Sequence, residues 1–377
     1  MNRQSLTQAP RYHLQDKNDE IDLRELFTSL WEGRVIIVLS LLLFTVTAFI
    51  YAFTAQQWWN AKATISPPEL NQIVTFQQQV KQYQPLFDLY QDDGTVIVSE
   101  ELDELINPAN IFQRFVRTFS ANDNKKRFMQ TSPTFLAIEK QLFQPSTSNN
   151  SDDARASFYQ NWYDRIAAHV VDSQTLGNKK QVNDVRLSFQ SIDKTSSLTL
   201  LREYVDFINS ILNQQLASDL ASKLTVKHNQ LAQQYSSLEQ QTKLRLKVEL
   251  VRTQYALTIA KAANVSEPVQ NLNEEKLFAI SIGSKALQAK IEALKSMVDL
   301  SVFEPRLAML KAQIQHLDIL GKNNPAQVQS YSYVAQPEEP MSRDKPKRSL
   351  IVVLGMIIGA LFGGVVVLLR FATRVRS

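Results

Sequence analysis

The sequence predicts an α+β membrane protein in which two transmembrane helices flank an external domain with a small α/β base and a very long helical arm. Residues 35–55 and 350–369 are apolar runs of 21 and 20 residues without a charged side chain. At about 1.5 Å per residue, each run matches the ~30 Å hydrocarbon core of a bilayer. Residues 196–263 contain no glycine or proline and are rich in Leu, Gln, Lys and Ala, which predicts the arm.

The first apolar run is predicted to be a retained membrane helix rather than a cleaved secretory signal. Its 21 residues exceed the usual core of a signal, which has roughly 7–15. It is followed by Trp58 and Trp59, and paired indoles are typical of the membrane–water interface.

The distribution of basic residues predicts that both termini are cytoplasmic. Arginines flank the outer ends of the two runs: Arg24, Arg34, Arg370, Arg374 and Arg376. A second basic group, on the predicted external side, disagrees with this orientation: Arg343, Lys345, Lys347 and Arg348. Loops as long as the 294 residues between the runs cross the membrane largely regardless of charge, so the orientation stands.

The base is predicted from three strands that come from distant parts of the chain: 58–66, 184–190 and 327–335. Helices are expected between the first two, notably at 108–119, where Asn107 offers an N-cap and Pro108 a first-turn proline.

The arm is predicted to be an antiparallel hairpin with packing of the coiled-coil type. A helix over 196–263 would be about 100 Å long, and its narrow leucine stripe needs partner helices along its length. After a break at 264–270, Leu287, Ile291 and Leu294 continue the pattern in a second arm that Gly283 and Pro305 divide into two or three helices.

These observations give a domain organisation with seven segments. They are a cytoplasmic tail with an amphipathic segment (1–34), the first transmembrane helix (35–55), the α/β base (56–195), the helical hairpin arm (196–320), a return strand with a Pro-rich connector (321–349), the second transmembrane helix (350–369) and a cytoplasmic tail (370–377).

No catalytic residue, metal site or cofactor site is predicted. The sequence lacks the phosphate-binding loop, the Gly-x-Ser-x-Gly motif and the His-Glu-x-x-His motif. Its four histidines are far apart and it has no cysteine. The net charge of +4 is spread along the chain, which argues against a nucleic-acid partner. An acidic segment, 88–104, is interpreted as a solvated loop because it lacks the ligand spacing of a calcium loop.

The second apolar run carries Gly355, Gly359 and Gly363, which fall on one helical face and predict close contact with another helix. The contact could be with the first transmembrane helix or with a partner protein. The alternative is that glycine is simply common in transmembrane helices.

A proline-rich connector precedes this run and is expected to be extended and stiff: Pro337, Pro340, Lys345, Pro346 and Lys347. With Gly359, it resembles the Pro-x2-Pro-x4-Ser-Pro-Lys…Gly pattern of the Wzz-type chain-length determinant family, although Lys345 stands where the family usually has Ser. The start of the chain agrees, because 20–23, Leu30-Trp31 and 58–68 also resemble the family.

The resemblance implies a class 1 polysaccharide co-polymerase of the Gram-negative inner membrane, with a periplasmic main domain, that regulates the modal chain length of lipopolysaccharide O-antigen. It implies a homo-oligomeric ring, an octamer being favoured, and two partners: the O-antigen polymerase and its undecaprenyl pyrophosphate-linked glycan. It implies no enzymatic activity. Another surface glycan (enterobacterial common antigen or capsule) is an alternative target.

A structural periplasmic adaptor of an export system is the alternative from another class of protein. Adaptors normally have one N-terminal span and a lipoyl-like β domain. The second apolar run and the small number of predicted strands argue against that class.

Overall fold

The computed structural model describes residues 28, 30–91, 93–143, 151–176, 179–268, 278–321 and 325–375. The chain forms two compact units, which we describe separately. The membrane unit comprises Met1–Asn60, Gln190–Ser197 and Glu339–Ser377, and the base-and-arm unit comprises Ala61–Phe189 and Leu198–Glu338. Most of the predicted amphipathic segment at 20–32 and part of the break at 264–270 lie outside the described residues.

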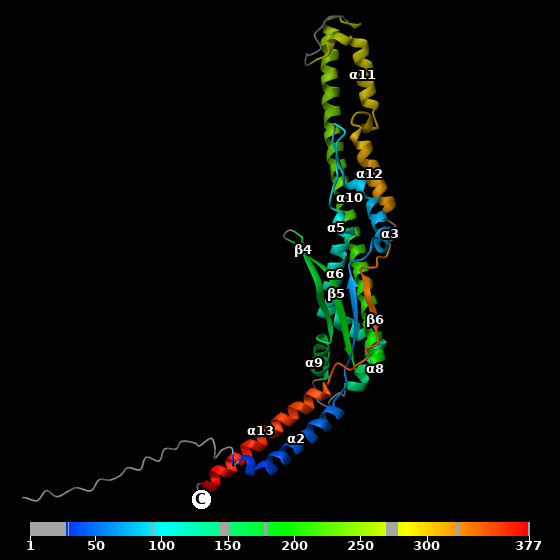
Figure 1. Cartoon of the computed structure of the whole chain (residues 1–377). Coiled ribbons are helices and arrows are strands. Elements are labelled where there is room, and N and C mark those ends of the chain that lie inside the picture. The colour runs from blue at the N-terminus through cyan, green and yellow to red at the C-terminus, as the bar shows by residue number, and fades with distance from the viewer. Residues whose placement is uncertain are drawn as a thin grey trace, which may run out of the picture. The chain divides into compact units, whose positions relative to one another are not determined.

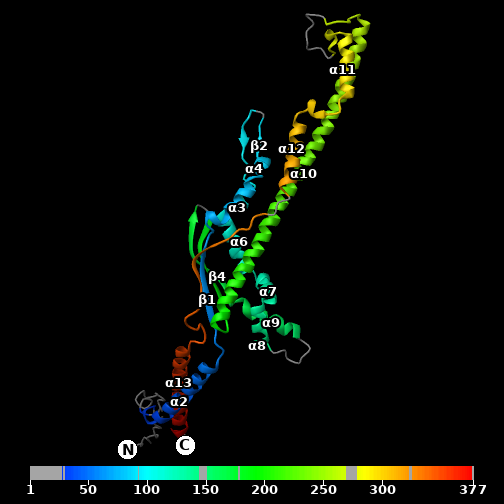
Figure 2. The same ribbon diagram turned by 90° about the vertical axis from the view of Figure 1, so that its right-hand side faces the viewer.

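Two long apolar helices dominate the membrane unit: α2 (Arg34–Thr54) and α13 (Arg348–Val375). They lie side by side in both views (Figures 1 and 2). Both are long and apolar enough to cross a bilayer. In α2 the hydroxyl groups of Thr45, Thr47 and Thr54 donate hydrogen bonds to carbonyl oxygens four residues earlier, so these polar groups are satisfied without water.

The base contains a four-stranded sheet in the order β4-β5-β1-β6. Its strands are β1 (Trp59–Ser66), β4 (Ile166–Leu176), β5 (Lys179–Ser191) and β6 (Ser332–Glu338). β1 pairs with β6 antiparallel, from Lys62 opposite Glu338 to Ser66 opposite Ser332. β4 and β5 form an antiparallel hairpin. The strands predicted at 58–66 and 184–190 are confirmed, whereas β4 was not predicted.

The predicted strand at 327–335 begins only at Ser332, because the preceding backbone binds α10 (Lys194–Ala262) instead of another strand. The Val328 N–H donates to Asn213 Oδ1 at 2.7 Å, and the Ser330 N–H donates to Asn209 Oδ1 at 3.1 Å. Two asparagine side chains of the helix therefore take the hydrogen bonds that a sheet would have supplied.

Helices lie between β1 and β4 in the sequence: α3 (Leu70–Lys81), α4 (Gln84–Phe87), α5 (Asp103–Ile106), α6 (Pro108–Ser120), α7 (Asn122–Thr131), α8 (Pro133–Leu142) and α9 (Ser151–Tyr163). The predicted start of α6 is confirmed, since Asn107 Oδ1 accepts hydrogen bonds from the N–H groups of Ala109 and Asn110. The core is rich in fully buried aromatic side chains: Phe112, Phe115, Phe119, Phe135, Phe189 and Tyr204.

The arm consists of the 69-residue helix α10, about 100 Å long, and two shorter helices, α11 (Ser284–Ser296) and α12 (Arg306–Leu320). α11 and α12 lie along α10 in both views (Figures 1 and 2). Gly283 has a φ of 83°, and a Cβ there would lie 2.7 Å from the Glu267 carbonyl carbon. A residue without a side chain is therefore required where the second arm begins. The predicted leucine stripe is buried at Leu287, Ile291 and Leu294.

The acidic segment 88–104, interpreted from sequence as a solvated loop, is largely exposed, as predicted, but contains a two-stranded hairpin and the start of helix α5. β2 (Leu89–Tyr90) pairs antiparallel with β3 (Val96–Ile97), and Gly94 at the turn has a φ of 84°. Taken together, the two apolar helices, the mixed base and the long arm confirm the predicted fold class.

Candidate functional site

The three predicted glycines of α13 face α2 along one line, which we call the glycine seam. A Cβ added to Gly355 would lie 2.5 Å from Ala48 Cβ, and one added to Gly359 would lie 2.8 Å from Leu41 Cα. A Cβ on Gly363 would lie 2.8 Å from Ile37 Cα. The two backbones therefore approach more closely than any larger residue at these positions would permit.

The seam is antiparallel and continues beyond the three glycines. As the α13 position moves from Gly355 to Gly363, the facing α2 position moves back from Ala48 to Ile37. One step further, Gly33 lies directly against Val367 and takes the role of the small residue from the other helix. The glycines of α13, together with Gly33 directly before α2, thus maintain the close approach along the pair.

A hydrogen bond and an aromatic contact reinforce the centre of the seam. Ser40 Oγ donates to the Gly359 carbonyl oxygen at 2.7 Å, which the missing side chain of that glycine leaves accessible. The rings of Phe44 and Phe362 lie 5.4 Å apart between centroids and border the same contact. Polar contacts of this kind across helices contribute to association in lipid.

The ends of both helices meet at Arg348, where α13 begins. Its Nε donates to the Ala52 carbonyl oxygen at 3.1 Å, and its guanidinium lies 3.9 Å from the centroid of the Phe53 ring. The cation therefore satisfies a carbonyl at the end of α2 and contacts an aromatic face.

The predicted connector is divided between the two units. Pro337 lies in the base-and-arm unit, where its carbonyl oxygen accepts a hydrogen bond from Arg202 Nη2 at 3.2 Å. Pro340, Lys345, Pro346 and Lys347 lie in the membrane unit.

In the membrane unit, the connector binds the segment that follows α2. The Trp58 N–H donates to the Lys345 carbonyl oxygen at 2.9 Å, and the Asp344 N–H donates to the Trp58 carbonyl oxygen at 2.8 Å. These two bonds join the chain leaving the first helix to the chain entering the second. The Lys347 carbonyl oxygen accepts the Ile351 N–H in the first turn of α13.

The buried ionisable groups of the base have structural partners. Burial raises the pKa of the Tyr204 hydroxyl, which donates to the Phe119 carbonyl oxygen at 2.7 Å. Burial also lowers the pKa of Lys125, whose ammonium donates to the Tyr163 carbonyl oxygen at 3.0 Å. In the part of the chain that the structure describes, no group of three or more His, Cys, Asp or Glu side chains could hold a metal ion.

Sequence reasoning identified the glycines but missed the residues that face them. Ser40 and Ala48, small residues eight positions apart on the first apolar run, were the available signal, since two turns of helix place them near one face. Their pairing with particular glycines depends on the antiparallel register, which no local pattern contains.

Comparisons with known proteins show which proteins this chain is similar to. A family model described as "Wzz: Chain length determinant protein" matches residues 19–107. The "ECA polysaccharide chain length modulation protein" of Salmonella typhimurium (strain LT2) is 26% identical over 364 residues, covering 94% of this chain and 96% of that protein. The "Chain length determinant protein" of Escherichia coli is 23% identical, covering 94% of each. The "Ferric enterobactin transport protein FepE" of Escherichia coli (strain K12) is 24% identical, covering 96% of this chain and 91% of that protein.

Two solved structures share the fold. A full-length bacterial polysaccharide co-polymerase matches with a TM-score of 0.58 and 20% identity, covering 94% of this chain and 98% of that chain. The wild-type Shigella flexneri lipopolysaccharide O-antigen chain-length regulator WzzBSF matches with a TM-score of 0.50 and 19% identity, covering 76% and 100%.

The two membrane helices, the mixed base and the long arm thus define a protein with the polysaccharide co-polymerase fold. The chain is similar to the Wzz chain length determinant family over residues 19–107 and to its members along nearly its whole length, as the resemblance in the sequence predicted. Members of this family are regulators rather than enzymes. The two apolar helices, each long enough to cross a bilayer, flank the base and arm in the sequence.

Proposed function

We propose that this polysaccharide chain-length regulator sets the modal length of lipopolysaccharide O-antigen. It would act on the polymerase that extends the undecaprenyl pyrophosphate-linked glycan. The observation that carries the proposal is similarity along nearly the whole chain, spans included, to a chain length determinant protein. A protein that shared only the periplasmic fold would lack the membrane part through which a membrane-bound polymerase can be reached.

The glycine seam supports a specific way of acting. Because Gly355, Gly359 and Gly363 contact α2, the two spans form one close pair, and their outer apolar faces are left for lipid or the polymerase. Among the outer residues are Leu39 and Leu361, which are 71% and 67% exposed. The residues of the connector, Pro337 to Lys347, would fix how this pair joins the periplasmic domain.

Exposed apolar residues on the arm support a homo-oligomeric ring. We propose that this ring is an octamer. Val226, Leu244, Tyr255 and Ile319 are large apolar residues that remain well exposed in a single chain. A ring would bury these side chains against a neighbouring copy of the arm. In this arrangement residues 1–34 and 370–377 are cytoplasmic and 56–349 are periplasmic.

Enterobacterial common antigen is the second candidate glycan. The observation in its favour is that the Salmonella common-antigen modulation protein is slightly more similar to this chain, at 26%, than the Escherichia coli chain length determinant, at 23%. Capsule and a role as an export adaptor have no specific observation in their favour.

Deletion of the gene, followed by separate electrophoresis of lipopolysaccharide and of common antigen, tests the proposal. We expect the modal O-antigen ladder to be replaced by a distribution without a preferred length, and the common antigen to be unchanged. A change confined to common antigen would establish the second candidate, and two unchanged profiles would contradict both.

A further inference from the structure

A groove of about 490 Å³ lies in the base-and-arm unit between the β2–β3 hairpin and the helices α10 and α12. We call it the hairpin groove. Figure 2 shows the hairpin standing beside these helices. Its floor includes Leu231 and Leu310, which are both buried where α12 packs on α10.

One wall of the groove is a row of side-chain amides. Gln230, Gln234 and Gln241 recur on α10 at spacings of four and seven, which places them on one helical face, and Gln313 faces them from α12. Across the described parts of the chain, the amides of Gln230, Gln234 and Gln313 form no hydrogen bond. Each amide can both donate and accept, so the row offers alternating donors and acceptors to a ligand.

The opposite wall is an aromatic side chain on an anchored hairpin. Tyr90 lines the groove and is 56% exposed. The base of the hairpin is fixed because Asp88 Oδ1 accepts from Gln84 Nε2 at 2.7 Å and from the Ser99 N–H at 3.0 Å. The acidic segment thus builds a wall of the groove, a role that its sequence did not suggest.

A second cavity lies along α10 nearer its N-terminal end. It measures about 480 Å³ and is lined by Asp219, Ser222 and Lys223 of α10 and by Asn110 and Arg117 of α6. The α10 residues that line the two cavities, from 219 to 241, span about 33 Å. Two cavities spread over this length suit a linear polymer better than a small molecule.

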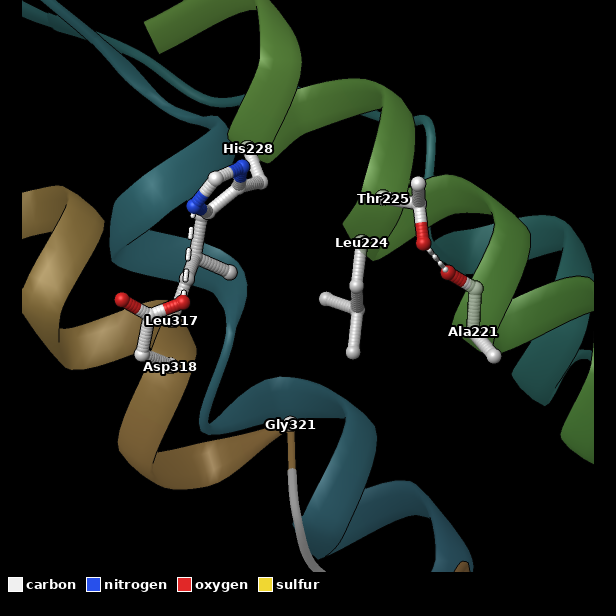
Figure 3. A pocket seen from close by; sticks show the side chains of 7 residues that line it. All are labelled: Ala221, Leu224, Thr225, His228, Leu317, Asp318 and Gly321. Atoms are coloured by element: carbon white, nitrogen blue, oxygen red, sulfur yellow. Dashed lines mark hydrogen bonds and ion pairs between the residues drawn. The ribbon is translucent and has the colours of Figure 1, made fainter. Parts of the chain in front are cut away.

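Another pocket between α10 and α12, near the C-terminal end of α12, is different. It measures about 360 Å³, and in Figure 3 His228 of α10 points toward Asp318 of α12, with 3.4 Å between His228 Nε2 and Asp318 Oδ1. The Thr225 hydroxyl donates to the Ala221 carbonyl oxygen. Its polar groups are therefore paired within the protein, whereas the amides of Gln230, Gln234 and Gln313 in the hairpin groove form no hydrogen bond within the described residues.

We propose that the hairpin groove binds a segment of the polysaccharide whose length the protein regulates, an inference that rests on the proposed function. Sugar hydroxyl groups both donate and accept hydrogen bonds, which matches the amide row. The apolar faces of sugar rings match Tyr90 and the leucine floor. Lys227 and Arg306 also line the groove and favour a glycan that carries carboxylates.

A second copy of the chain fits the groove less well. A protein surface that covered the groove would desolvate the amide row, and each amide left without a partner would weaken the contact. A hydroxylated chain supplies a partner for each amide. The exposed apolar residues of the arm, rather than the groove, are the surface suited to another protein.

Binding of a fluorescently end-labelled polysaccharide to the full-length protein in lipid nanodiscs tests the proposal. The probe is O-antigen released by mild acid from the lipopolysaccharide of the parent strain, and dextran of equal mass is the comparison polymer. We expect Gln230→Ala with Gln234→Ala to weaken binding about tenfold, since two hydrogen bonds are lost. Tyr90→Ala should weaken it about fivefold through loss of the ring contact.

The chain offers matched controls. Asn229→Ala with Gln233→Ala also removes two side-chain amides, each one position earlier on α10, which is about 100° around the helix and away from the groove. Phe303→Ala removes an aromatic side chain of the arm, 38% accessible, from outside the groove. We expect both controls to bind the probe as the unsubstituted protein does.

Three outcomes would overturn the proposal: no binding of the probe, equal loss in groove and control variants, or a change of subunit number confined to the groove variants while probe binding is unchanged. The last would mean that a second copy covers the groove. The glycan profile of the deletion strain is a separate test. A modal ladder that depends on the gene, without polysaccharide binding, would overturn the groove alone, and an unchanged glycan profile would overturn the proposed function.

Discussion

The membrane helices and the base hold their elements together with opposite kinds of residue. The α2–α13 pair packs on glycines. At the centre of the pair, the α2 backbone at Leu41 lies directly against Gly359. The base packs on aromatic rings, with Phe119 and Tyr204 4.7 Å apart and Phe128 and Tyr204 5.0 Å apart between centroids.

The difference follows from the solvent. In water, each buried aromatic ring contributes a large hydrophobic free energy, so large side chains stabilise the base most effectively. In a bilayer the surrounding lipid is as apolar as leucine, so close backbone approach and hydrogen bonds across helices are what remain to favour association. A substitution should therefore have opposite consequences in the two regions: loss of volume harms the base, and gain of volume harms the spans.

Phe119→Ala should have the largest effect. Phe119 is fully buried and contacts Tyr204, so its removal leaves a cavity, and we expect the free energy of unfolding to fall by about 3–5 kcal/mol. Chemical denaturation of the full-length protein in detergent, followed by tyrosine and tryptophan fluorescence, measures the change. Phe303→Ala, at a side chain that is 38% exposed, is the control and should cost much less.

Gly359→Leu with Gly363→Leu should separate α2 from α13 while leaving the base folded. Each leucine would collide with the backbone of α2, and we expect the disulfide between Phe44→Cys and Phe362→Cys to form at least about tenfold more slowly. The chain has no cysteine of its own, so the cross-link has no background. Gly364→Leu is the matched control, because the nearest atom to its added Cβ is Leu30 Cδ2 at 3.9 Å. Equal cross-linking in the double variant and the control would contradict the close seam.

Tyr159→Phe should have a smaller effect that depends on pH. Burial first, and then the hydrogen bond to Glu139, raise the pKa of Tyr159 from 10.0 to about 12. Because the folded-state pKa is the higher one, this stabilisation is complete below pH about 10 and is lost as the pH rises to about 12. The substitution should cost about 1 kcal/mol at neutral pH and make the loss of stability between these pH values shallower. Denaturation of both proteins across this pH range measures the difference in their free energies of unfolding. If the two free energies fell in parallel as the pH rose, the raised pKa would not belong to Tyr159.

Ser40→Ala should have the smallest effect. It removes the hydrogen bond to the Gly359 carbonyl oxygen without adding volume, and such bonds in membranes are worth about 0.6 kcal/mol on average. We expect the Phe44→Cys and Phe362→Cys cross-link to form about threefold more slowly. A loss as large as that of the glycine double variant would show that hydrogen bonding, rather than close approach, determines the pairing.

The elements with long or strong local patterns were predictable. Helix α10 was evident from 68 residues without a glycine or proline, and α6 from the Asn107-Pro108 start. The β2–β3 hairpin was missed because its strands have two residues each, too short for a periodicity. The start of β6 was misplaced because Asn209 and Asn213 of a distant helix bind the preceding backbone, a tertiary effect.

The candidate site was also predictable only in part. In-phase glycines indicated that something packs closely on α13, and local spacing could not identify α2 as the neighbour in preference to a polymerase. The hairpin groove could not be anticipated at all, since it combines residues near 90, 230 and 310. That the seam influences glycan length remains a prediction.

Complementation of the deletion strain tests the central claim, that this paired-span protein imposes glycan length. The unsubstituted gene, the Gly359→Leu with Gly363→Leu variant and the Gly364→Leu control would be expressed at equal levels, and the surface glycan separated by electrophoresis. The predicted result is a modal ladder with the unsubstituted gene and the control, and a shifted or lost mode with the double variant. A ladder of the same modal length in all three strains would contradict the account.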